Sequence, residues 1–125
     1  MRAVRRRDTG PELRIRRALW RLGFRYLVDY RHVPGKPDLA FTRKRKAIFV
    51  HGCFWHMCPR CFDRIAPKSR THYWLPKLQR NVERDERVIA ELEAIGWSAI
   101  VVYECQATNR KIDSTIRELT EFLEK

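Results

Sequence analysis

Long apolar runs are absent from this 125-residue sequence, and no stretch approaches the roughly 18 residues that a membrane-spanning helix needs. It also lacks a secretory signal pattern, an internal repeat and a low-complexity stretch. Glycine and cysteine are scarce, with five and four residues. We therefore expect one domain over residues 1–125, monomeric and cytoplasmic, with a single core and no membrane partner.

Acidic residues are the other scarcity, with 15 Asp and Glu against 27 Lys and Arg, for a formal net charge of +12. Residues 1–80 hold 21 basic and 5 acidic residues, whereas residues 81–125 hold 6 and 10. A basic surface interleaved with aromatic residues binds polyanions, although it can also be a merely solvated face. We predict a nucleic acid as the partner, with phosphate contacts from a basic arm over residues 1–8 that contains Arg2, Arg5, Arg6 and Arg7.

Hydrophobic periodicity predicts an α/β fold, a small mixed sheet with helices on both faces. A capping box at Thr9 starts a first helix, which carries Ile15, Leu19 and Leu22 on one face. The remaining patterns predict strands at 24–28, 38–41, 47–50 and 97–103, and helices at 73–94 and 112–123. A strand–helix–strand unit between residues 47 and 103 implies a parallel, right-handed crossover.

Three cysteines lie in a loop without periodicity, residues 51–72, and the fourth follows the last predicted strand. If strands 47–50 and 99–103 are parallel neighbours, their carboxyl ends meet and Cys105 can join the loop cysteines. A closed tetrahedral site with four thiolates is structural, because it leaves no open position for chemistry. We predict a structural metal held by Cys53, Cys58, Cys61 and Cys105; the alternatives are unligated thiols, or His51 or His56 in place of one cysteine.

A carboxylate at a strand start, Asp38 after Pro37, is typical of the metal site of restriction-type nucleases. The second acid and the lysine of such sites are expected near residues 49–51, where this sequence has Phe-Val-His instead. Asp38 could also serve only to cap the preceding turn.

Larger segments are more specific: Pro34-Gly-Lys-Pro-Asp38, Ile48-Phe-Val-His-Gly-Cys-Phe-Trp-His56 and Asn81-Val-Glu-Arg-Asp85. With these segments the chain resembles, over nearly its whole length, the very short patch repair (Vsr) endonuclease family. The resemblance implies a restriction-endonuclease-like α/β/α sandwich with a structural Zn²⁺ and a catalytic Mg²⁺. It also implies nicking of duplex DNA on the 5′ side of the mispaired T at T·G mismatches, with mismatch-repair proteins as further partners.

The resemblance also implies a role for each catalytic residue. Asp38 and the main-chain carbonyl of Val50 would hold Mg²⁺, and His56 would act as general base, as imidazoles commonly do. His51 and Asp85 would form a supporting polar pair. Asp85 interrupts an apolar helical stripe, so a buried carboxylate needing a partner, His51 or an arginine, is expected there.

Three further positions have both a functional and a plainer interpretation. The resemblance gives Glu12 a catalytic contribution, although its place in the capping box explains it equally well. Phe54 and Trp55 would intercalate into DNA, with Met1 inserting from the minor groove. The two aromatic residues could instead belong to the core.

Two departures from the family pattern bear on these expectations. Val50 stands where the best-known pattern has Thr, and Cys58 stands where some members use His. Two other functions stay open on sequence alone: a Vsr-like homing or defence nuclease with another target, and a non-catalytic, zinc-stapled DNA-binding module.

Overall fold

The computed structural model describes residues 10–125, and its sheet has four strands that lie side by side in chain order. The basic arm, the Thr9 cap and the DNA contacts expected of Met1, Arg2, Arg5, Arg6 and Arg7 lie outside the described residues. The strands are β1 (Leu27–Val28), β2 (Leu39–Phe41), β3 (Lys46–His51) and β4 (Ser98–Tyr103).

The pairing of the strands brings the carboxyl ends of β3 and β4 together. β1 and β2, and β2 and β3, pair antiparallel, whereas β3 and β4 pair parallel from Lys46 opposite Ser98 to His51 opposite Tyr103. The predicted parallel neighbours are thus confirmed.

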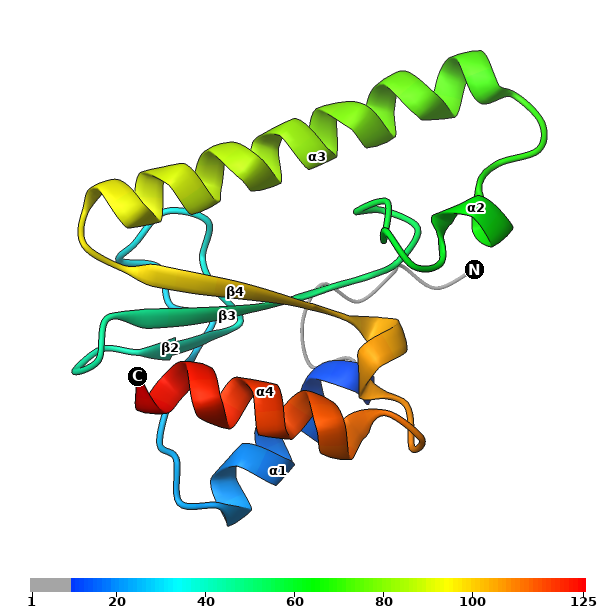
Figure 1. The fold of residues 1–125 in the computed structure, drawn as a ribbon. Helices are drawn as coiled ribbons and strands as arrows, with labels where there is room; N and C mark the ends of the chain where they lie inside the picture. The colour runs from blue at the N-terminus through cyan, green and yellow to red at the C-terminus, as the bar shows by residue number, and fades with distance from the viewer. Residues whose placement is uncertain (1–9) are drawn as a thin grey trace.

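Helices cover both faces of the sheet (Figure 1). The long helix α3 (Thr71–Ala94) crosses one face, while α1 (Gly10–Arg21) and α4 (Ile112–Glu124) pack on the other. The expected mixed α/β architecture is confirmed in this form. Within residues 10–125, no helix combines the length and the apolar character that crossing a membrane requires.

Alternation along β3 decides which side chains face which helices, since successive side chains of a strand point to opposite faces. Ile48 belongs to the core cluster with α1 and α4, and Val50 packs against that cluster. Ala47 and Phe49 belong to the cluster with Leu92 of α3. The next residue in this alternation, His51, therefore faces α3.

Four local expectations are wrong or incomplete. Leu22 is 58% exposed and lies past the end of α1, and the first strand spans only Leu27–Val28, whose side chains are exposed. The loop 51–72 contains a short helix, α2 (Phe62–Ile65), and a 3₁₀ helix, η1 (Glu104–Ala107), follows β4. α2 buries no residue, so it leaves no hydrophobic pattern to detect.

The turn before β2 is pressed against α3. Gly35 has a φ of +82°, and a Cβ there would overlap Val88 of α3. Only glycine meets both conditions, a left-handed backbone and no side chain. This turn and the fully buried Pro37 set the position of Asp38 at the start of β2.

Candidate functional site

The four cysteines converge at the carboxyl ends of β3 and β4. Their sulfur atoms all lie within 4.8 Å of one another, and none forms a disulfide. The Sγ atoms of Cys58 and Cys105 are 3.7 Å apart. A tetrahedral ion with metal–sulfur bonds of about 2.3 Å has sulfur–sulfur edges of about 3.8 Å, so the group fits such an ion. His51 and His56 belong to a different group of side chains, so the four cysteines form this set without them.

The electrostatics of the thiols also favour a bound cation. Burial raises the pKa of Cys53, and burial together with the thiols of Cys61 and Cys58 raises the pKa of Cys105 to about 11. Burial also opposes ionisation of Cys58, but hydrogen bonds from the backbone amides of Arg60 and Cys61, with those from the thiols of Cys105 and Cys53, outweigh it and lower that pKa to about 7. Four thiolates cannot coexist here without a positive charge among them, and a divalent metal would supply it.

The loop that carries three of these cysteines has little apolar packing of its own. Its buried side chains are the cysteines, with Tyr103 packed against them. The amide of Cys53 donates to Oε1 of Glu104 at 3.0 Å, and the amide of Cys58 donates to the carbonyl of Cys53 at 2.9 Å. The cysteine side chains therefore form the interior of this loop.

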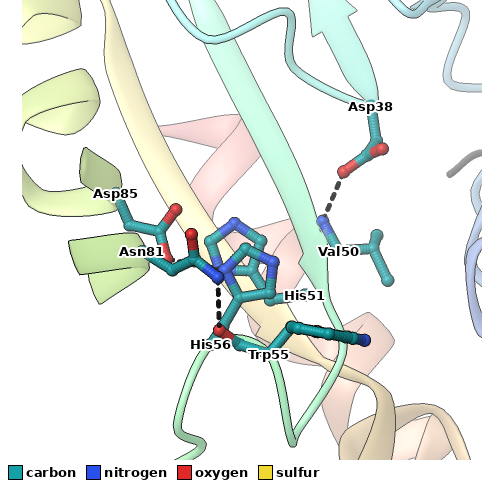
Figure 2. A network of polar contacts seen from close by, with 7 residues as sticks. All are labelled: Asp38, Val50, His51, Trp55, His56, Asn81 and Asp85. Carbon is teal, nitrogen blue, oxygen red and sulfur yellow. Dashed lines mark hydrogen bonds and ion pairs between the residues drawn. The ribbon is translucent and has the colours of Figure 1, made fainter. Parts of the chain in front are cut away.

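His56 and Asp85 form a histidine–aspartate pair between the loop after β3 and α3 (Figure 2). Nδ1 of His56, from the loop, lies 2.6 Å from Oδ2 of Asp85, from α3. An ionised carboxylate only accepts, so Nδ1 of His56 carries the hydrogen and Nε2 keeps its lone pair. That is the arrangement a general base requires.

His51 stacks on the ring of His56, with centroids 3.8 Å apart and planes 12° apart. It is 8% exposed, and its Nδ1 has no hydrogen-bond partner although Oδ2 of Asp85 is 3.9 Å away. Burial, helped by His56 and opposed by Asp85, lowers the pKa of His51 to about 4. The structure thus differs from expectation: Asp85 is a quarter exposed and its closer partner is His56, with His51 second.

Asp38 lies across β3 from the two histidines (Figure 2). Its Oδ2 accepts a hydrogen bond of 2.6 Å from the amide of Val50. Burial raises the pKa of Asp38 to about 7; the Val50 amide opposes this rise, and the charges of Glu12 and Asp29 add to it. N–H and C=O of one residue in an extended strand point to the same edge, so the Val50 carbonyl also faces the Asp38 side.

Two more carboxylates accompany Asp38. The side chains of Glu12, Asp29 and Asp38 bring oxygen atoms within 4.8 Å of one another. Glu12 is 2% exposed and forms an ion pair with Arg16 at 3.2 Å, so it is more than a surface capping residue. Crowded carboxylates of this kind suit a hard cation such as Mg²⁺, which takes oxygen ligands.

Asp29 was missed by sequence reasoning. No sequence pattern marked it, since it is a single acidic residue directly after β1. Its φ of +47°, which Asp tolerates better than most residues, is seen only in the structure. Its amide donates to the carbonyl of Asp38 at 3.2 Å, and this strand pairing brings the two carboxylates together.

The predicted aromatic pair forms a cluster with a third ring, Trp74 of α3. Trp55 is 37% exposed, and the Phe54–Trp74 and Trp55–Trp74 centroid distances are 5.5 and 5.8 Å. Nδ2 of Asn81 donates to the carbonyl of Trp55 at 3.3 Å. Phe54 and Trp55 are therefore not part of the main core, and Trp74 joins them from a helix that begins twenty residues later in the chain than β3 ends.

Comparison with known proteins gives consistent similarities. The sequence model described as "DNA mismatch endonuclease Vsr" matches residues 1–60. The DNA mismatch endonuclease Vsr of Escherichia coli (strain K12) is 41% identical over 125 residues, covering 100% of this chain and 79% of that protein. The Type II nicking enzyme V.XorIIP of Xanthomonas oryzae is 41% identical over 109 residues, covering 87% of this chain and 79% of that protein. V.NmeAIP of Neisseria meningitidis, also a Type II nicking enzyme, is 40% identical over 109 residues, with 87% and 77% covered.

Proposed function

The chain belongs to the Vsr family of DNA mismatch endonucleases, and from that membership we propose that it nicks duplex DNA on the 5′ side of the mispaired T at a T·G mismatch. The relatives that carry the proposal are named as a mismatch endonuclease and as nicking enzymes. We place its action on bacterial DNA in the cytoplasm.

One observation carries the chemical part of the proposal. A histidine whose Nδ1 is held by a carboxylate, His56 with Asp85, stands near a carboxylate whose burial raises its pKa to about 7, Asp38. Both flank the carboxyl end of β3 (Figure 2). A positioned base beside a site for a hard cation is what phosphodiester hydrolysis needs.

Each residue then has a distinct task. Asp38, with the carbonyl of Val50, would hold Mg²⁺, which when bound would stabilise charge on the scissile phosphate and on the leaving oxygen. Nε2 of His56 takes a proton from the attacking water, and Asp85 stabilises the imidazolium that results. His51 restrains the ring of His56 by stacking on it.

Recognition of the mismatch falls to the aromatic cluster of Phe54, Trp55 and Trp74. Trp55 is exposed enough to stack against bases, and inserting rings between base pairs costs least where the pairing is already defective. The thiolate site holds Zn²⁺ and acts structurally, because four protein ligands fill its coordination.

Nicking of end-labelled duplexes tests the proposal. With Mg²⁺, a T·G duplex should be cut on one strand, 5′ to the T, at least tenfold faster than its T·A and C·G counterparts, and a chelator should abolish cutting. Equal cutting of matched DNA would indicate a nuclease with another target. Tight binding without nicking at any Mg²⁺ concentration would overturn the enzymatic proposal.

Asp38→Ala supplies the matching active-site control. Loss of the metal-binding carboxylate should reduce single-turnover nicking by on the order of a thousandfold while leaving DNA affinity nearly intact. Asp113→Ala removes an exposed carboxylate at the start of α4 and should leave nicking unchanged. Equal activity of the two variants would show that Asp38 has no catalytic task.

A further inference from the structure

We propose that His51, His56 and Asp85 form a second metal site, which binds a transition-metal ion such as Zn²⁺ and switches the general base off. The binding part of this proposal stands on geometry alone, whereas the inhibitory part rests on the proposed nuclease function. The site is separate from the four cysteines and from the carboxylates around Asp38.

The ligand atoms of the three side chains are already close together. Each offers one ligand atom, and these atoms all lie within 4.8 Å of one another. A tetrahedral ion with bonds of 2.0–2.1 Å has ligand–ligand edges of about 3.3 Å. The distances from Oδ2 of Asp85 to the two Nδ1 atoms, 2.6 Å for His56 and 3.9 Å for His51, bracket that edge. A shift of the carboxylate toward His51 equalises them. The two rings are stacked nearly parallel, so both must tilt out of the stack before each Nδ1 lone pair points at one ion.

The buried nitrogen of His51 is the second, independent observation. His51 is 8% exposed, and its Nδ1 is buried without a hydrogen-bond partner. This nitrogen lies 3.9 Å from Oδ2 of Asp85. A buried polar atom without a partner costs free energy, and such atoms in native proteins call for an explanation. An ion between His51 and Asp85 would satisfy this nitrogen, while His56 and Asp85, each about a quarter exposed, leave room for solvent ligands on the ion.

The donor set selects the kind of ion. Two imidazole nitrogens and one carboxylate oxygen suit Zn²⁺, Co²⁺ or Ni²⁺, whereas Mg²⁺ prefers oxygen ligands alone. The carboxylate group of Glu12, Asp29 and Asp38 offers such oxygens and no nitrogen. The two neighbouring groups therefore discriminate between metals through their donor atoms.

Binding would invert the tautomer of His56. Without the ion, the hydrogen is on Nδ1 and the lone pair on Nε2. An ion can bind Nδ1 only through a lone pair on that nitrogen, so the hydrogen must leave Nδ1. A neutral ring then carries its hydrogen on Nε2. The hydrogen moves from Nδ1 to Nε2 through solvent, no proton is released overall, and Nε2 has no lone pair left with which to accept a proton from water.

Metal stoichiometry tests the binding part without any activity measurement. Protein whose four-cysteine site is loaded with Zn²⁺ is dialysed near neutral pH against buffered micromolar Zn²⁺, and bound zinc is counted. We expect two zinc ions per chain for the unaltered protein, and one for Asp85→Asn and for His51→Ala. His32→Ala, which removes an exposed histidine, should keep two. A count of one in the unaltered protein, or of two in both site variants, would overturn the proposal.

Inhibition is tested by nicking in Mg²⁺ with added Zn²⁺. We expect at least a tenfold loss at the concentration that fills the second site, and no relief when Mg²⁺ is raised. Relief by Mg²⁺ would place the inhibitory ion at Asp38 and overturn the inhibitory role. If no duplex is nicked under any condition, the proposed function fails, while the zinc count still decides the second site.

Discussion

The sheet and the loop after β3 each supply half of the candidate site, but they hold their residues by different means. Asp38 directly precedes β2 and His51 ends β3, and the side chains of these two strands are mostly buried, including Leu39 and Ile48, both 0% exposed. His56 and Trp55 belong to a loop whose buried side chains are cysteines. Packing therefore positions the sheet residues, whereas the loop residues depend on what the thiols bind.

Removal of the metal should produce the largest difference in amide exchange between the sheet and the loop. Stripping the ion from the four thiols should leave β3 and β4 protected from amide exchange and should expose the amides of residues 52–61. The free energy of such binding is on the order of 10 kcal/mol, far above what this loop gains from packing. Nicking should fall to background and return when Zn²⁺ is restored. Unchanged exchange in the loop after chelation would show that the loop is packed like the sheet.

His56→Ala asks whether a loop residue can be catalytic without being structural. We expect single-turnover nicking to fall by about two to four powers of ten, the usual contribution of general acid–base catalysis. Without added Zn²⁺, the zinc held by the four cysteines and the melting temperature should stay unchanged, because the ring lies outside the cysteine group. His32→Ala serves as the control. Loss of the zinc held by the four cysteines in His56→Ala would make this residue a ligand of the structural site.

Trp55→Ala tests whether the exposed face of the loop reads DNA. Loss of the stacking ring should weaken binding to a T·G duplex by about 1–3 kcal/mol and reduce the preference over matched DNA. Trp20→Ala is the matched control, since this tryptophan is 48% exposed on α1. Fluorescence anisotropy measures both affinities. An equal loss in the two variants would point to general electrostatic binding rather than to the loop.

Asp38→Asn tests whether the packing around β2 and β3 keeps the Asp38 carboxylate buried although burial disfavours its charge. Burial raises its pKa from 3.8 to about 7, so the folded state binds the proton more tightly than the unfolded state. Below pH 4 this group therefore does not reduce the free energy of unfolding. The reduction grows as pH rises toward 7 and persists above it. Without Mg²⁺, Asp38→Asn should be more stable at pH 8 by about 1–2 kcal/mol, with the difference vanishing near pH 4.

Thermal unfolding of both proteins across this pH range gives the measurement. Added Mg²⁺ should narrow the difference at pH 8, because only the carboxylate gains from the cation. A variant less stable than the unaltered protein at pH 8 would mean that the Val50 hydrogen bond outweighs the burial of the charge.

Much of this organisation follows from local pattern. The apolar strand at 47–50 and the apolar strand at 97–103 predicted a parallel pair, and their shared carboxyl ends brought Cys105 to the loop cysteines. Leu22 was placed wrongly because a helical stripe continues in sequence past the residue where α1 ends. Asp29 and Trp74 escaped because neither belongs to a periodic pattern or to a spaced set of ligands.

The sequence by itself determined the types of element and the chemical nature of the donors, since periodicity, turn residues and side-chain chemistry act over a few residues at a time. The choice among partners lay with the tertiary structure. Asp85 could pair with His51 or an arginine on sequence grounds, yet α3 crosses the sheet so that its carboxylate meets His56 first. Distances between such groups depend on how layers pack, and layer packing sums small contacts along the whole chain, which no local pattern contains.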